Sequence, residues 1–461
     1  PYYEWVEHTL PVQTAPMGTK EEIFLRAAER VGLPLQTSKD ITRAAYRPQE
    51  NAILQPQGTA GRTANPDRLR YPQARGCTFC GYCYLGCYEP RGAPRNLAAK
   101  RSTDASYIPM ALTADAWHQG GKPITLITDA FVTNLTTASE AGQTVARAVT
   151  WRDQTSGAMH QEEGKVVVMS AGCIENPRLW LNSGLPNPNG WVGQGLTDHG
   201  YDFVVGKVPF DAGFSRGPNS NARADIPGRG ALEHIGLPPA LTASIMNLSD
   251  SGMAGLYDNG APVGRAGADS VGRLVGKQLR SFLSDIDRLV GIQIYTDDDV
   301  ETQNRVTISS VFPPDENGPV PQIDMHRRDR TSRTRKNREY MAALAVKVLR
   351  AAGATKVARL DWQPILLHVQ STMRMGTDAK TSVLDENAES RFVRRLFVAD
   401  NSALANALGS PNPTLTTQAL ATRTAEKIFS RYFGGDPWVH QEAPLASTAP
   451  EVTKAVLARG L

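Results

Sequence analysis

Apolar residues recur along this chain with two different periods, and each change of period marks an expected element. Residues 20–30 repeat apolar positions every three to four residues and stop before Gly32, which predicts an amphipathic helix. The same period over residues 334–352 and 414–429 predicts two more helices, the second of them starting directly after Pro413. A weaker helical pattern follows in the Pro- and Ala-rich tail.

Short apolar or alternating runs predict strands between these helices. The run at 165–169 leads through a small-residue turn into a helix over residues 176–183 that ends at Gly184. A Gly- and Asn-rich stretch, 212–232, separates strands in the middle of the chain. The pattern as a whole predicts an α/β (α+β) fold with a mostly antiparallel sheet within residues 201–360. The predicted strands lie at residues 123–128, 130–135, 145–151, 165–169, 201–209, 289–295 and 304–310.

The composition is that of a globular protein and does not by itself indicate a function. The chain has 461 residues, of which 41% are apolar and 21% charged, an ordinary globular balance. Its net charge of +4 gives no argument for nucleic-acid binding. No apolar run reaches the roughly 18–20 residues of a membrane span, and residues 1–30 do not resemble a signal peptide. The location stays open between the cytoplasm and the periplasm after cofactor loading.

Two polar side chains at element ends form the candidate catalytic pair. His368 follows the apolar run 365–367, and an imidazole with an unperturbed pKa of about 6.5 suits proton exchange near neutrality. Asn412 carries a carboxamide that can hold a substrate oxygen, and Pro413 fixes the backbone as it turns into a helix. A lone histidine beside apolar residues is more often structural than catalytic, so the pair depends on its surroundings for support.

The segments around this pair resemble the C-terminal region of the glucose–methanol–choline (GMC) flavin oxidoreductases. The resemblance runs in order through residues 368–376, 396–402 and 412–421. It implies the subtype with one catalytic His and one catalytic Asn, here His368 and Asn412, which many sugar and sterol oxidoreductases share. FAD is the cofactor that the resemblance implies.

Two earlier segments extend the resemblance. Residues 170–184 resemble the second GMC signature, and residues 193–199 resemble the family turn G-x-N-L-x-D-H. His199 in that turn is implied to pack beside the cofactor in a structural role. The resemblance also implies that the backbone of Val132 touches the adenine. The cofactor-binding residues implied in this way are Val132, Ala171, Gly172, Asp198, Asp400, Asn401, Asn412, Pro413 and Thr414.

The glycine-rich phosphate turn that an FAD site needs is not found in residues 1–120. Its near match, Gly193-Gln194-Gly195 with Gly200, lacks the strand–turn–helix context that such a turn requires. We therefore expect an FAD-binding domain that is incomplete at its N-terminus, with the missing segment on a separate chain or elsewhere in a longer protein. The expected division is an FAD-binding portion at 1–200, a substrate domain at 201–360, a return to the FAD-binding domain at 361–435 and a peripheral tail at 436–461.

Four of the five cysteines lie close together, within an expected loop at residues 76–90. The spacing Cys77-x2-Cys80-x2-Cys83-x3-Cys87 matches the bacterial ferredoxin run, so it allows one iron–sulphur cluster, either [3Fe–4S] or [4Fe–4S]. A zinc knuckle, disulfides and buried thiols are the alternatives. Some sugar-oxidising GMC dehydrogenases carry a [3Fe–4S] cluster at this point, and others have a similar loop without one.

These features together predict an FAD-dependent dehydrogenase of a small-molecule alcohol or sugar. His368 would accept the hydroxyl proton while the hydride moves to flavin N5, and Asn412 would hold the same oxygen. Electrons would leave to an acceptor protein or small subunit, through the cluster if one is present. The alternatives are an oxidase that uses oxygen, with structural cysteines, and a fragment or subunit that binds FAD only with a partner chain.

Overall fold

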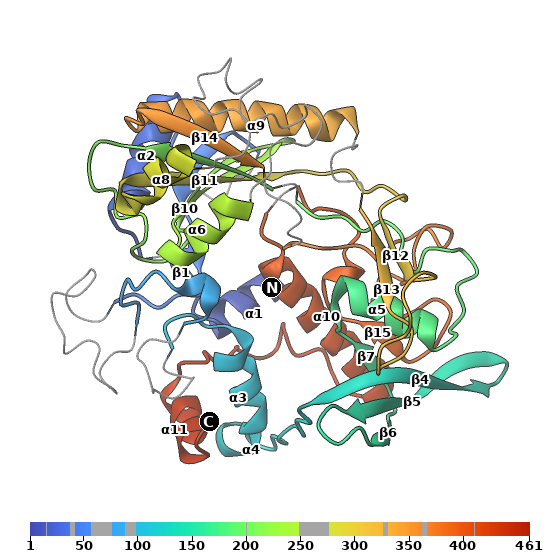
Figure 1. The fold of residues 1–461 in the computed structure, drawn as a ribbon. Coiled ribbons are helices and arrows are strands. Elements are labelled where there is room, and N and C mark those ends of the chain that lie inside the picture. Colours follow the sequence, from blue (N-terminus) through green and yellow to red (C-terminus); the bar gives the residue numbers. More distant parts are fainter. Residues whose placement is uncertain are drawn as a thin grey trace.

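The computed structural model combines helices with mostly antiparallel sheets (Figure 1), which confirms the predicted fold class. The residues before His368 at 365–366 and the end of the cysteine loop at 88–90 lie outside the described part of the chain. No described helix is long and apolar enough to cross a bilayer. The structure describes residues 1–14, 16–36, 42–56, 76–87, 98–199, 201–248, 276–325, 331–361, 367–409 and 411–461.

A six-stranded antiparallel sheet forms the larger of the two main parts. Its strand order is β14-β8-β11-β10-β9-β2, so the first strand along the sequence lies at one edge. β11 is buried along its whole length, which shows that both faces of the sheet are covered. The strands are β2 (Ala45–Pro48), β8 (Tyr201–Lys207), β9 (Ala222–Ile226), β10 (Gly230–Ile235), β11 (Leu289–Thr296) and β14 (Lys356–Asp361).

Helices cover both faces of this sheet, as Figure 1 shows with α9 along its upper side. Successive residues of β8 point to opposite faces, so Val204 joins the core under α2 and α9 whereas Phe203 and Val205 join the core under α6 and α8. The sheet is therefore rigid and holds the side chains at its edges in place. The helices are α2 (Thr19–Arg30), α6 (Pro239–Leu248), α8 (Gly276–Leu283) and α9 (Ser332–Ala351).

The second part is built around a short parallel pair, β7 (Val167–Met169) with β15 (Leu396–Val398). A separate apolar core joins these strands to α5 through Trp180 and to the hairpin β4–β5 through Leu135. Figure 1 shows that hairpin projecting at the lower right, with α10 running through the centre of the molecule. The remaining elements here are β4 (Ala130–Glu140), β5 (Gln143–Asp153), β6 (Met159–Glu163), α5 (Gly172–Asn182) and α10 (Thr414–Phe433).

Shorter elements connect the two parts. α1 packs against α10, and the C-terminal α11 packs against α3 and α4, with Val452 and Val456 buried beside Met110. β12 and β13 form a hairpin next to α5. The bounds are α1 (Tyr2–Thr9), β1 (Gln13–Thr14), β3 (Glu50–Asn51), η2 (Cys83–Leu85), η4 (Thr103–Ala105), α3 (Tyr107–Leu112), α4 (Ala114–Trp117), η5 (Ile286–Arg288), β12 (Arg305–Ile308), β13 (Pro321–Asp324), η6 (Asn401–Ala403) and α11 (Pro450–Ala458).

Three sequence-based predictions are wrong in the structure. Residues 123–128 form no strand, because this segment is exposed throughout and pairs with no other strand in the described chain. The Gly- and Asn-rich stretch 212–232 contains β9 and the start of β10, whose residues are almost all buried. The helix predicted from residue 176 begins at Gly172, so Pro177 lies inside it.

Candidate active site

Two histidines from distant parts of the chain meet at the centre of the site. His199 lies on the loop before β8, and His368 lies beyond β14. The Nδ1 atoms of the two rings are 2.8 Å apart. A β-bridge between Thr197 and Gln370 joins the two loops, with N–O distances of 3.1 and 2.8 Å. The structure thus places His199, which the sequence analysis assigned to a structural role, directly against the predicted catalytic base.

The hydrogen bonds of His199 determine which nitrogen of each ring carries a proton. The carbonyl oxygen of Ala407 can only accept, and it lies 2.7 Å from Nε2 of His199, so that nitrogen donates. Nδ1 of His199 is then the acceptor, and Nδ1 of His368 donates to it. The lone pair of His368 consequently lies on Nε2, which is the ring atom able to take up a proton.

Burial keeps both imidazoles uncharged. Burial, followed by His199 and Arg223, lowers the pKa of His368 to about 2. Burial also lowers the pKa of His199, against the opposing effect of its bond to Ala407. Tyr295 stacks on the His368 ring with centroids 5.2 Å apart and planes at 21°. The candidate base is therefore neutral at physiological pH and fixed in orientation.

Asp198, predicted to bind the cofactor, contacts the backbone of His368. Its Oδ1 accepts a hydrogen bond from the His368 N–H at 2.9 Å. Asp198 is itself completely buried. This contact anchors the loop that carries the base.

Asn412 enters the site from the segment before α10 and is held by Glu233 of β10. Nδ2 of Asn412 donates to Oε1 of Glu233 at 3.1 Å, and Nη1 of Arg223 is 2.9 Å from the same carboxylate oxygen. The charge of Arg223 also lowers the pKa of His199 and His368. Arg223 therefore interacts electrostatically with both histidines and shares the carboxylate of Glu233 with Asn412. It connects the two predicted catalytic residues, His368 and Asn412.

Four predicted cofactor residues gather at the carboxyl ends of the parallel strands β7 and β15. Ala171 and Gly172 follow β7, and Asp400 and Asn401 follow β15. Oδ2 of Asp400 accepts hydrogen bonds from the Gly172 N–H at 2.7 Å and from Nδ2 of Asn176 at 2.8 Å. Ligands of open α/β sheets bind in the crevice at this edge of the strands, so the position suits a nucleotide cofactor.

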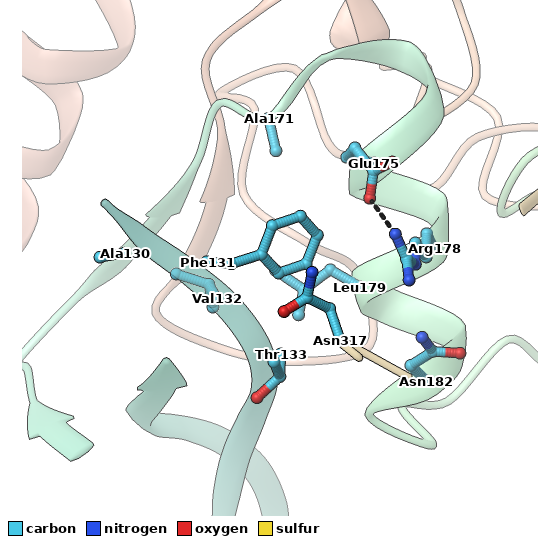
Figure 2. Close-up of a pocket in the computed structure, with 10 residues that line it drawn as sticks. All are labelled: Ala130, Phe131, Val132, Thr133, Ala171, Glu175, Arg178, Leu179, Asn182 and Asn317. Atoms are coloured by element: carbon cyan, nitrogen blue, oxygen red, sulfur yellow. Dashed lines mark hydrogen bonds and ion pairs between the residues drawn. The ribbon is translucent and has the colours of Figure 1, made fainter. Parts of the chain in front are cut away.

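A cavity of about 220 Å³ lies beside these strand ends and has Val132 and Ala171 in its wall (Figure 2). Figure 2 shows the Phe131 ring between β4 and α5, and the Arg178 guanidinium lies 5.3 Å from the centre of that ring. Glu175 forms an ion pair with Arg178 at 3.3 Å. An apolar wall with an aromatic face and a few polar groups suits a flat heteroaromatic ring such as adenine.

A larger cavity of about 470 Å³ lies at the start of α10, where Pro413 is the N-cap and Thr414 is part of the lining. Tyr84 of the cysteine loop also lines it and hydrogen-bonds to Tyr295, the residue stacked on His368. Arg101 also lines this cavity. The lining of this cavity thus includes both the start of α10 and a tyrosine bonded to the ring that stacks on the candidate base.

Comparison with known proteins identifies the family. Two family models described as GMC oxidoreductase match residues 46–201 and 300–421, which contain His199 and His368 respectively. The chain belongs to the GMC oxidoreductase family. Paromamine 6'-oxidase of Streptomyces fradiae is 29% identical over 61% of this chain and 48% of its own length.

Two other relatives of this GMC protein are dehydrogenases. The fructose dehydrogenase large subunit of Gluconobacter japonicus is 26% identical over 59% of this chain and 48% of its own length. The 2-methyl-1,2-propanediol dehydrogenase of Mycolicibacterium austroafricanum is 26% identical over 62% of this chain and 52% of its own length. The chain spans about half the length of these curated relatives.

The four clustered cysteines of this GMC protein, Cys77, Cys80, Cys83 and Cys87, line one cavity of about 10 Å³. That volume is about what one water molecule needs, so the loop as it stands leaves no room for a cluster. Burial raises the pKa of Cys77 to about 12 and of Cys83 to about 11, which keeps both as thiols. Within the described ranges, no group of three or more His, Cys, Asp or Glu side chains is arranged to hold a metal ion.

Three residues of this GMC site were not predicted from the sequence: Arg223, Glu233 and Tyr295. All three come from the central strands β9, β10 and β11 of the large sheet. The strand containing Tyr295 was predicted, but Arg223 lies in the Gly- and Asn-rich stretch 212–232 and Glu233 directly follows it. Arg223 has Ala on both sides, a pattern that could have indicated a buried strand, whereas Glu233 stands between Leu232 and His234 and gave no such signal.

Proposed function

We propose that this GMC oxidoreductase oxidises the CH–OH group of a small alcohol or sugar, with FAD as the hydride acceptor. The observation that carries the proposal is the chain of hydrogen bonds from Ala407 through His199 to His368. It leaves the lone pair on Nε2 of a neutral imidazole, which is the state that a general base needs before it takes a proton. Bound FAD would supply the redox chemistry, and the protein would supply orientation and proton transfer.

The residues present fit a role in holding FAD. Val132 and Ala171 would contact the adenine in the cavity of about 220 Å³. Gly172, Asp400 and Asn401 lie at the carboxyl ends of β7 and β15, where the ribityl-pyrophosphate part would run. Asn412, Pro413 and Thr414 would approach the flavin ring from the N-terminus of α10, whose dipole favours negative charge.

The catalytic step follows from the geometry of His368. The substrate hydroxyl would donate to Nε2 and pass its proton there as the carbinol carbon loses its hydride. The resulting imidazolium still donates from Nδ1 to His199, so the same hydrogen bond holds the ring before and after proton transfer. Asn412 would donate to the substrate oxygen and hold the carbinol carbon in line for transfer. The same hydrogen bond would stabilise the negative charge that develops on this oxygen.

We also propose that a glycine-rich unit outside these residues completes the FAD site, on the same chain or on a partner. A surface that could receive it supports this proposal. In the part of the chain that the structure describes, β7 pairs only with β15, and Val168 of β7 is 46% exposed. Ile124, Leu126 and Ile127 are also exposed in the extended segment before β4. Parallel strands are rarely stable with an uncovered edge, so this edge suits another strand.

For the electron acceptor, we propose a molecule other than oxygen, which the dehydrogenase names of two relatives support. The spacing of Cys77, Cys80, Cys83 and Cys87 matches an iron–sulphur run, but the cavity that they line has no room for a cluster, so we assign them no step in electron transfer. Tyr84, next to Cys83, hydrogen-bonds to the tyrosine stacked on His368, so the loop touches the site.

The names of the relatives support a small hydroxylated substrate. They refer to paromamine, fructose and 2-methyl-1,2-propanediol. They include both an oxidase and dehydrogenases, so the acceptor has to be measured. The large-subunit name of the fructose dehydrogenase supports a partner subunit.

The first experiment is His368→Ala in FAD-loaded protein, with the anaerobic rate of flavin reduction by alcohols and sugars as the readout. Loss of the base should slow reduction by roughly 10²- to 10⁴-fold, the usual contribution of general base catalysis. Normal FAD content with an unchanged rate would remove the role proposed for His368. Rapid reoxidation of the reduced flavin in air would favour the oxidase alternative over the dehydrogenase.

A further inference from the structure

Glu233 is a fully buried acidic residue in the middle of a core strand, a position where acidic side chains are rare. Its exposure is 1%, and every residue of β10 from Gly230 to Ile235 is buried. A carboxylate removed from water is costly unless it is paired and hydrogen-bonded. The contacts of Glu233 therefore indicate what it does.

Three side chains surround this carboxylate. Nη1 of Arg223 lies 2.9 Å from Oε1, and the Ser220 hydroxyl donates to Oε2 at 3.0 Å. Nδ2 of Asn412 donates to Oε1 at 3.1 Å. Arg223 is held in turn by Asp225 at 2.6 Å. The arginine and serine are close to Glu233 in the chain, whereas Asn412 is the contact that reaches across to α10.

This contact sets the orientation of the Asn412 carboxamide. Oε1 of Glu233 accepts from Arg223, so the nitrogen of Asn412 must face it, and the reversed amide would bring two acceptor oxygens together. Oδ1 of Asn412 is buried and has no hydrogen-bond partner among the described residues. Since Oδ1 makes no bond that could fix the amide, its orientation is determined by the contact of Nδ2 with Glu233.

We propose that Glu233, held by Arg223, is a positioning residue that fixes the flip state of Asn412 and so presents its second Nδ2 hydrogen to the substrate oxygen. This inference rests on the function proposed above, in which Asn412 holds that oxygen. One amide hydrogen is used by Glu233, and the other remains for the substrate. In the flipped state a carbonyl oxygen would face the developing negative charge and would repel it.

The test is a double-mutant cycle with Glu233→Gln and Asn412→Ala. A glutamine at this position has nearly the same shape but can donate as well as accept, so it no longer excludes the flipped amide. Glu233→Gln alone should slow anaerobic flavin reduction by about 10- to 100-fold, the loss expected for a misplaced catalytic group. In the Asn412→Ala background the same change should alter the rate by less than about twofold, because no amide remains to be positioned.

A second readout does not depend on turnover. The free energy of unfolding, measured for the same four proteins, should show a coupling between Glu233 and Asn412 because the two side chains are hydrogen-bonded in the folded protein. Glu339→Gln is the matched control, since it also removes one of two carboxylate partners of a buried arginine, Arg359, on the same sheet. This control should leave flavin reduction unchanged.

The outcomes separate this inference from the proposed function. Equal slowing by Glu233→Gln in both backgrounds, or absence of any coupling in unfolding, would overturn the positioning role. If Asn412→Ala slows reduction and Glu233→Gln does not, the inference alone is wrong. If Asn412→Ala leaves reduction unchanged while unfolding shows the coupling, the role of Asn412 in the proposed function is wrong and the inference falls with it.

Discussion

Replacement of His199 by phenylalanine keeps a planar ring beside Tyr295 and removes both nitrogen atoms that connect Ala407 to His368. The Nδ1–H of His368 then loses its acceptor. One neutral hydrogen bond contributes about 1 kcal/mol, and a buried donor left unpaired costs about 1–3 kcal/mol. Since about 1.4 kcal/mol is a factor of ten in rate, flavin reduction should slow by roughly 5- to 150-fold.

The assay is stopped-flow reduction of the enzyme-bound flavin under anaerobic conditions at saturating substrate. His199→Asn is the matched control, because its Oδ1 takes the position of Nδ1 and can still accept from His368. That variant should lose less than about fivefold. Thermal unfolding and FAD content identify any variant that has simply lost its fold. Unchanged reduction in well-folded, FAD-loaded His199→Phe would refute the argument that His199 sets the tautomer of the base.

Three other outcomes are expected. Burial lowers the pKa of His199, His234 and His368, so below pH about 6.5 the unfolded chain binds more protons than the folded one. The free energy of unfolding should be greatest above that pH and fall as the pH decreases; a flat urea-unfolding profile between about pH 7 and 5 would contradict this. Asp400→Ala should lower that free energy by about 1–3 kcal/mol, because the Gly172 N–H loses its acceptor; a change below about 0.5 kcal/mol would argue against it. If a cluster is present, the wild-type protein should contain about three or four irons with acid-labile sulphide, and Cys77→Ser should contain less; flavin without iron would make the cysteines structural.

The fold was predictable wherever one element carried its own periodic signal. Residues 334–352 and 414–429 gave helices close to those observed, Ser332–Ala351 and Thr414–Phe433. The segment 123–128 looked like a strand, because alternation describes the side chains and says nothing about whether another strand is available to pair with. β9 was missed for the opposite reason: the turn-forming residues around it concealed a short buried strand.

The candidate site was predictable only in part, because the chemistry depends on contacts between residues far apart in sequence. His368 and Asn412 stood in recognisable motifs. The contact of His368 with His199 spans 169 residues, and the contact of Asn412 with Glu233 spans 179. Neither spacing nor composition specifies which distant side chain approaches a given amide or imidazole, and it is these partners that determine the tautomer and the flip state.

The β-bridge between Thr197 and Gln370 joins two loops that the large sheet separates along the chain. Contacts of such high sequence separation close only after much chain entropy has been lost, and folding slows as they become more numerous. The two histidines will therefore come together late in folding, after the hairpin β4–β5 and the long helices have formed. A partly folded chain would already have most of its secondary structure but would lack the contact between His199 and His368. Recovery of activity during refolding would therefore measure when this contact forms.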